Sequence, residues 1–172
     1  MVPRIPYPAM ESLSPEIRAL VESFPMNVAR MVANAPASVK GFLELAQSVL
    51  FFSAFDPRKR EIAVLRVAQV TRSIYEWTHH VVVAKHFNIT DKEIEIIRTE
   101  EPVTSLDEEG NLLCRVADEI SRDVRLSDDA LAQILERYGV QWTTELILCV
   151  SYFNFLSRFL ESTRVELEDS HC

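Results

Sequence analysis

Acidic and imidazole side chains gather between positions 61 and 80 of the sequence. Glu76 and His80 are four residues apart, so on a helix they share one face, and Ser73 lies seven residues before His80 on that same face. A carboxylate that orients an imidazole forms an acid–base pair, because the imidazole titrates near neutral pH. A structural interpretation also stays open: a glutamate that favours the helix dipole and a histidine in an internal contact.

Glu61 begins an apolar stripe, with Val64, Leu65 and Ala68 three, four and seven residues later. A carboxylate on such a stripe lies either at the mouth of a pocket or in a buried position, where burial raises its pKa. Arg66 also has apolar neighbours and is the expected counter-charge of Glu61. A functional carboxylate and a buried structural Glu–Arg pair are therefore both open.

Glu76 and His79 also form a Glu-x-x-His pattern, which is half of a di-iron carboxylate site. The other copy, Glu168 with His171, falls in the C-terminal tail rather than in a helix. We therefore expect no metal. His79 shares a different helix face with Tyr75 and can point to a neighbouring helix or subunit.

The elements that position these residues are expected to be helices. Ser14-Pro15 and Asp56-Pro57 are each an N-cap followed by a proline in the first turn, and Asn27 can cap a short helix. Thr90 and Ser105 each begin a capping box. No segment shows the sustained alternation of a strand. The expected helices cover residues 15–24, 28–35, 36–53, 57–70, 75–87, 128–138 and 141–161, with two more after the capping boxes. The sequence therefore predicts an all-α fold.

Length and composition limit the classes of function that the protein can have. The chain has 172 residues, 48% of them apolar, which is enough for one domain with its own core. Its net charge of −8 argues against a nucleic-acid footprint and against binding to an anionic membrane. The longest apolar stretch, residues 146–160, is too short and too polar to span a bilayer. We therefore expect no nucleic-acid partner and no membrane.

The cysteines indicate a reduced, cytoplasmic compartment. Cys114, Cys149 and Cys172 form neither a C-x-x-C motif nor a zinc pattern. Cys114 and Cys149 lie among apolar residues and are predicted to be buried as small hydrophobic side chains. Prolines interrupt residues 1–8, so no secretory leader is visible.

The last expected helix has almost no polar face. Phe153, Phe155 and Phe159 face different directions, and a helix that is apolar all round needs cover on every side. Either a central position in the core or a second subunit supplies that cover. The tail from Thr163 is expected to be a peripheral, solvated end.

The two segments that contain Glu61 and His80 resemble the carboxymuconolactone decarboxylase family, which includes the alkylhydroperoxidase D-like proteins. They are Arg60-Glu-Ile-Ala-Val-Leu-Arg-Val-Ala and Ser73-Ile-Tyr-Glu-Trp-Thr-His-His. The resemblance extends over most of the chain. It implies a single all-α, alkylhydroperoxidase D-like domain over residues 1–172, with about seven to eight helices. It also implies a homo-oligomer, as a trimer, a hexamer or a dimer-based assembly.

The peroxidase branch of that family uses a glutamate, a C-x-x-C motif and a histidine four residues after the second cysteine. Matched from Glu61, the two cysteine positions fall on Ser73 and Glu76, and the histidine falls on His80. Thiol-based peroxide reduction needs a thiolate and a resolving thiol. This chain therefore resembles a Tyr-Glu-Trp-x-x-His subgroup in which alkylhydroperoxidase activity is not expected.

The decarboxylase branch acts on a carboxylated lactone without a metal or an organic cofactor. The resemblance thus implies a cofactor-independent acid–base enzyme that decarboxylates or isomerises a small carboxylated lactone or carbonyl compound. The expected catalytic residues are His80, Glu76 and Glu61, and the expected substrate-binding or supporting residues are Ser73, Tyr75, Trp77, His79 and Arg66. The alternative is a ligand-binding or assembly protein without catalysis, in which Glu76 and His80 form a buried structural pair.

Overall fold

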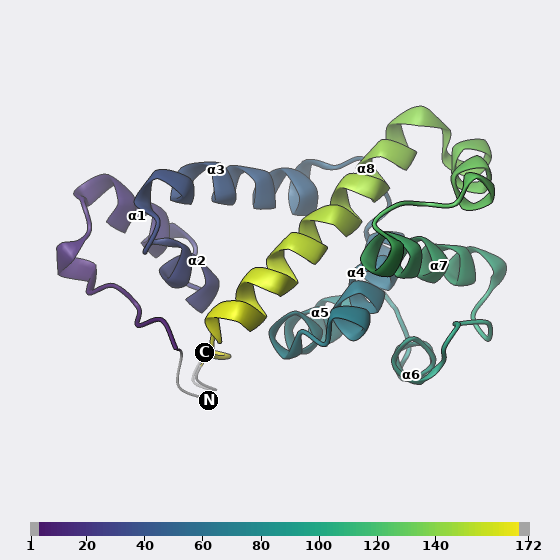
Figure 1. Ribbon diagram of the computed structural model, residues 1–172, viewed down its shortest axis with the longest axis horizontal. Coiled ribbons are helices and arrows are strands. Elements are labelled where there is room, and N and C mark those ends of the chain that lie inside the picture. Colours follow the sequence, from purple (N-terminus) through teal and green to yellow (C-terminus); the bar gives the residue numbers. More distant parts are fainter. Residues whose placement is uncertain (1–3, 169–172) are drawn as a thin grey trace. The chain divides into compact units, whose positions relative to one another are not determined.

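The structure is a computed structural model that describes residues 4–168, and over these residues it contains helices and no strands. Within this part of the chain, eight α-helices follow one another (Figure 1). Their bounds are α1 Pro15–Ser23, α2 Asn27–Val32, α3 Pro36–Gln47, α4 Pro57–Thr71, α5 Ile74–His86, α6 Asp91–Thr99, α7 Glu108–Asp123 and α8 Asp128–Thr163. The predicted all-α fold is confirmed.

The chain forms two compact units. The first, the terminal unit, joins residues 4–52 with residues 159–168, and the second, the central unit, consists of residues 53–158. The prediction that residues 1–172 form one domain stays a prediction. In the described part of the chain, no helix is both long enough and apolar enough to cross a bilayer.

Within the terminal unit, the first helix begins as predicted. The Ser14 hydroxyl accepts a hydrogen bond from the N–H of Ile17, and a proline occupies the first turn of α1. The predicted helix over 36–53 is α3 followed by a π-helical turn, Ser48–Phe52.

The predicted N-cap of the second helix, Asn27, is wrong. Asn27 is the first residue of α2, and its backbone N–H donates to the carboxylate of Glu168 at 2.8 Å. Its side chain donates instead to the carbonyl of Glu166 at 3.1 Å. A carboxylate from the C-terminal segment thus satisfies the helix end that Asn27 was expected to cap.

The central unit is built around α4, which packs against α5, α6 and α7 (Figure 1). Asp56 accepts a hydrogen bond from the N–H of Lys59, so α4 begins at the predicted cap. The nine residues 60–68 are all buried, as expected for a helix with few polar groups. Arg72, in a left-handed conformation, ends α4 and lets α5 begin two residues later.

The capping box predicted at Thr90 is confirmed, whereas the one at Ser105 is wrong. The N–H of Ser105 donates to the carboxylate of Glu100 at 3.1 Å, and α7 begins three residues later, capped by Asp107. Asp107 accepts from the N–H of Gly110 at 2.7 Å. A Cβ at Gly110 would meet atoms of Leu106 and Asp107 at 3.0 Å, so any larger side chain here would push these neighbours aside by a few tenths of an ångström.

Gly139 separates the two helices predicted over 128–138 and 141–161. Its φ of 68° and ψ of 179° are not helical, and they kink α8 at this point. Beyond the kink, Phe153 lies in the core of the central unit, whereas Phe155 is 54% exposed. The second subunit expected to cover the outer side of this helix stays a prediction.

Candidate active site

Three of the predicted residues meet inside the central unit, where α4 lies against α5. His80 Nδ1 donates a hydrogen bond to Glu61 Oε2 at 2.6 Å. On the other side of the ring, His80 Nε2 lies 3.4 Å from Glu76 Oε2, one helical turn away on α5. The imidazole is therefore held between two carboxylates from two helices, an arrangement that we call the Glu–His–Glu cluster.

The Glu–His–Glu cluster is buried. Glu61, Glu76 and His80 are 0%, 4% and 8% exposed. Burial by itself lowers the pKa of His80, but hydrogen bonds and charge attraction from Glu61 and Glu76 outweigh it and raise the pKa to about 9. His80 is therefore an imidazolium at neutral pH.

The counter-charge of Glu61 is Arg60, not Arg66 as the sequence suggested. Arg60 Nε donates to Glu61 Oε1 at 3.1 Å, and the Arg60 side chain is also buried. The positive charges of Arg60 and His80 thus balance the negative charges of Glu61 and Glu76, and such pairing is the condition for burying charged groups. Residues adjacent on a helix do not normally face each other, so helix spacing gives no reason to choose Arg60.

Arg66 belongs to a separate structural network. Its Nε and Nη2 donate to the two oxygens of Asp118 at 2.6 and 2.9 Å, in a bidentate pair. Its Nη1 donates to the carbonyls of Ile97 and Glu100 at 3.0 and 2.9 Å. Arg66 therefore ties α4 to α7 and to the end of α6, away from His80.

The remaining predicted residues lie on α5 or at its start. His79 Nδ1 is 2.8 Å from the carbonyl of Tyr75, and the two rings are 4.3 Å apart, so these two residues pair with each other. Trp77 is half-buried. Ser73 is the N-cap residue of α5, and its hydroxyl is buried with no hydrogen-bond partner among the described residues. The Ser73 hydroxyl is therefore not bonded to His80.

Sequence reasoning missed the helix that covers the cluster, α8. The rings of His80 and Phe153 are 4.8 Å apart and nearly perpendicular, at 87°. Cys149 and Tyr152 share that face of α8 and are buried with Phe153. Only the apolar run over 146–160 signalled such a role, and it did not identify which residues would contact His80.

The described cysteines are buried, as predicted, and neither is in a disulfide. Burial raises the pKa of both Cys114 and Cys149 to about 12. Neither side chain is a thiolate at neutral pH. Cys172 and His171 lie outside the described residues.

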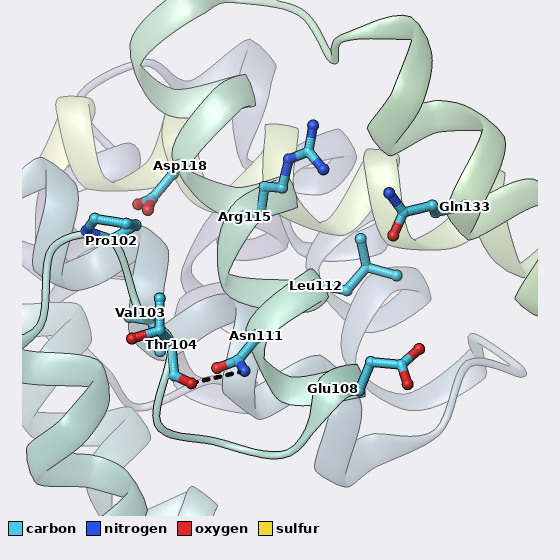
Figure 2. Close-up of a pocket in the computed structure, with 9 residues that line it drawn as sticks. All are labelled: Pro102, Val103, Thr104, Glu108, Asn111, Leu112, Arg115, Asp118 and Gln133. Atoms are coloured by element: carbon cyan, nitrogen blue, oxygen red, sulfur yellow. Dashed lines mark hydrogen bonds between the residues drawn. The ribbon is translucent and has the colours of Figure 1, made fainter.

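A pocket of about 500 Å³ in the central unit lies apart from the cluster (Figure 2). It is lined from the loop after α6, from α7 and from α8 by Pro102, Val103, Thr104, Glu108, Asn111, Leu112, Arg115, Asp118 and Gln133. Its polar groups are already paired: Asn111 donates to the Thr104 carbonyl at 3.0 Å, and Asp118 binds Arg66. Among the described residues, no group of three His, Cys, Asp or Glu side chains is arranged to hold a metal ion.

Comparison with solved structures identifies the fold. An alkylhydroperoxidase AhpD core, an uncharacterized peroxidase-related protein from Ralstonia eutropha JMP134, superposes with a TM-score of 0.80 at 12% identity, over 98% of this chain and 94% of its own. An uncharacterized peroxidase-related protein from Silicibacter sp. TM1040 gives 0.78 at 14% identity, over 99% and 96%. A protein of unknown function from Agrobacterium tumefaciens, described as a candidate antioxidant defence protein AhpD, gives 0.68 at 17% identity, over 81% and 97%. The predicted alkylhydroperoxidase D-like fold is confirmed.

No curated protein matches this chain. The family model of the carboxymuconolactone decarboxylase family matches residues 36–118, a segment that contains Glu61, Glu76 and His80. Over this segment the chain is similar to the carboxymuconolactone decarboxylase family, which confirms the resemblance seen in the sequence.

Proposed function

We propose that this protein is a cofactor-independent acid–base enzyme in which His80 exchanges a proton with the substrate. The observation that carries the proposal is the position of the imidazole between Glu61 and Glu76. Strongly shifted pKa values of this kind are concentrated at functional sites. Because the pKa of His80 is raised to about 9, the histidine begins the reaction in its protonated form, as a general acid.

The geometry supports different roles for the two carboxylates. Both oxygens of Glu61 are already occupied, one by Arg60 and one by His80 Nδ1, and its side chain is fully buried. Glu61 is therefore assigned as a positioning residue. Glu76 makes the longer contact, to Nε2, and is less completely buried than Glu61. His80 Nε2 and Glu76 are the groups assigned to proton exchange with the substrate.

A resident proton on His80 favours decarboxylation of a small carboxylated lactone or carbonyl compound. In that reaction the bond from carbon to the carboxylate breaks, CO₂ leaves, and the electron pair remains on carbon as an enolate. His80 Nε2 then gives its proton to that carbon, and solvent restores the proton. An isomerisation would instead require Glu76 to remove a proton from the substrate first.

A different observation favours the second candidate, a ligand-binding or assembly protein without catalysis. The four charged groups of Arg60, Glu61, Glu76 and His80 are all buried and their charges balance, as a structural cluster requires. An antioxidant role, suggested by the descriptions of the structural neighbours, has less support. Ser73 and Glu76 cannot form a redox pair, and the two described thiols have pKa values near 12.

The experiment that tests the proposed function is a screen of small carboxylated lactones and carbonyl compounds, with CO₂ release and substrate loss as readouts. The native protein is compared with His80→Gln and with His86→Gln, a matched control on the exposed end of the same helix. We expect turnover by the native protein and by the control and none by His80→Gln. Equal turnover by all three proteins would refute the role of His80.

We also propose that the protein self-associates, as a trimer, a hexamer or a dimer-based assembly. Several large apolar side chains of the central unit are exposed, among them Val82 on α5 and Leu148 and Phe155 on α8. Leu148 and Phe155 are seven residues apart and so share one face of α8, and contiguous apolar exposure is unusual for a monomer. Sedimentation of the native protein is expected to give a mass that is a multiple of the chain mass of 19.7 kDa. In Val82→Asp or Leu148→Asp the measured mass is expected to be smaller. A native monomer would contradict this proposal.

A further inference from the structure

The face of α8 that covers the Glu–His–Glu cluster places one residue beside each of its parts. Cys149 is near enough to Arg60 and Glu61 for their charges to act on its thiol. Tyr152 is near enough to Glu76 for that carboxylate, together with burial, to raise the pKa of the phenol. Phe153 contacts His80 itself. The titratable and charged groups around the imidazole therefore come from α4, α5 and α8.

Among these neighbours, Phe153 is the one without a polar group. Its side chain is fully buried, and its ring stands nearly perpendicular to the imidazole, with the ring centres 4.8 Å apart. Perpendicular rings at this separation attract each other and favour this mutual orientation. We therefore expect the buried phenylalanine ring to restrict tilting of the imidazole out of its plane. Water is also excluded from the volume that this ring fills.

The orientation of His80 matters because both of its nitrogens are in use. A rotation about the bond between Cβ and the ring moves Nδ1 away from Glu61 and Nε2 away from Glu76 at the same time. The contact at Nε2, at 3.4 Å, is too long to hold the ring by itself. A third contact, from outside α4 and α5, therefore helps to fix the orientation of the His80 ring.

We propose that Phe153 is a positioning residue for His80. Its ring keeps the imidazole in the plane in which Nδ1 meets Glu61 and Nε2 meets Glu76, and it shields the side of the cluster that faces α8 from water. For its effect on turnover this inference rests on the proposed function. The constraint on the ring itself is measurable without any substrate.

The test measures how fast the ring N–H protons of His80 exchange with water, by proton NMR of the full chain. The signals are assigned by their loss in His80→Gln. The variant is Phe153→Leu, which keeps an apolar side chain, with Phe153→Met as a second variant if the first does not fold. The matched control is Phe155→Leu, the same substitution two residues along the same helix on an exposed side chain. Circular dichroism confirms that each variant is helical.

We expect protected His80 ring protons in the native protein and in the control, and exchange about tenfold faster or more in Phe153→Leu, which corresponds to a loss of about 1.4 kcal/mol in the opening equilibrium. Exchange at the native rate in Phe153→Leu would overturn the inference. Equal acceleration in Phe155→Leu, or unprotected ring protons in the native protein, would overturn it as well.

Turnover separates this inference from the proposed function. With a substrate in hand, Phe153→Leu is expected to lower kcat more than it raises KM, because it disturbs a proton donor rather than a binding contact. If exchange accelerates in Phe153→Leu while His80→Gln turns over substrate normally, the proposed function fails and the positioning role stands. If His80→Gln is inactive while exchange is unchanged in Phe153→Leu, the proposed function stands and the positioning role of Phe153 fails.

Discussion

The raised pKa of His80 predicts that this residue stabilises the protein in a pH-dependent way. In the unfolded chain the imidazole has its ordinary pKa of 6.5, whereas in the folded protein Glu61 and Glu76 raise the pKa to about 9 despite the opposing effect of burial. A difference of about 2.5 units, at 1.36 kcal/mol per unit, corresponds to about 3 kcal/mol. The folded state binds the proton more tightly, so this contribution is complete below pH 6.5 and is lost as the pH rises through about 9.

The perturbation is His80→Gln, and the quantity is the difference in free energy of unfolding between the native protein and this variant. Chemical denaturation from pH 6 to about pH 9.5 measures that difference, and the effects of titratable groups that do not contact His80 cancel because both proteins share them. We expect the difference to shrink by about 3 kcal/mol over this range. In a Glu61→Gln background the change is expected to be smaller, since one of the two carboxylates has lost its charge. A difference that is independent of pH would refute the assignment of a buried imidazolium.

Three further predictions concern other parts of the molecule. The protein is expected to consume no hydroperoxide with a dithiol reductant, because both described thiols are buried with pKa values near 12; consumption above the buffer rate would contradict this. Arg66→Ala leaves Asp118 without its bidentate partner and is expected to lower the free energy of unfolding by about 3–5 kcal/mol in denaturant titrations. The pKa of His80, followed by NMR, is expected to stay unchanged in this variant. A shifted pKa of His80 would place Arg66 in the Glu–His–Glu cluster. Gly110→Ala is expected to destabilise the protein by about 1–3 kcal/mol, because the added Cβ has contacts at 3.0 Å. Gly41→Ala, with open space around its Cβ in α3, is expected to stabilise the protein by about 0.4–1 kcal/mol. The reverse order of the two variants in thermal unfolding would contradict the packing around Gly110.

Much of the fold could be predicted from local signals in the sequence. The caps at Ser14 and Asp56 and the capping box at Thr90 begin helices where the sequence places them, because these side chains bond to backbone groups within one turn. The two failed caps, Asn27 and Ser105, have different causes. At the start of α2 the carboxylate of Glu168 satisfies a backbone N–H, and local sequence rules do not include such a distant partner. Before α7 the cap is Asp107, two residues after Ser105, while the N–H of Ser105 donates to Glu100 in the preceding loop.

The cluster could be predicted only in part. Glu76 and His80 are one helical turn apart, so their proximity follows from spacing alone. Glu61 is 19 residues from His80, and no helix rule brings these two together; the family resemblance supplied that pairing. Phe153 and Arg60 were missed because one contact depends on how α8 packs and the other on how a long side chain folds back along α4.

The most direct test of the central claim is a titration of His80 by NMR in the intact native protein, with its signals assigned by their loss in His80→Gln. Glu61 and Glu76 hold the imidazole as a buried cation, so His80 is expected to remain protonated at neutral pH and to titrate near pH 9. In Glu61→Gln the pKa is expected to fall by about 1–2 units. A native His80 that titrates at or below pH 6.5 would contradict the Glu–His–Glu cluster as an acid–base site.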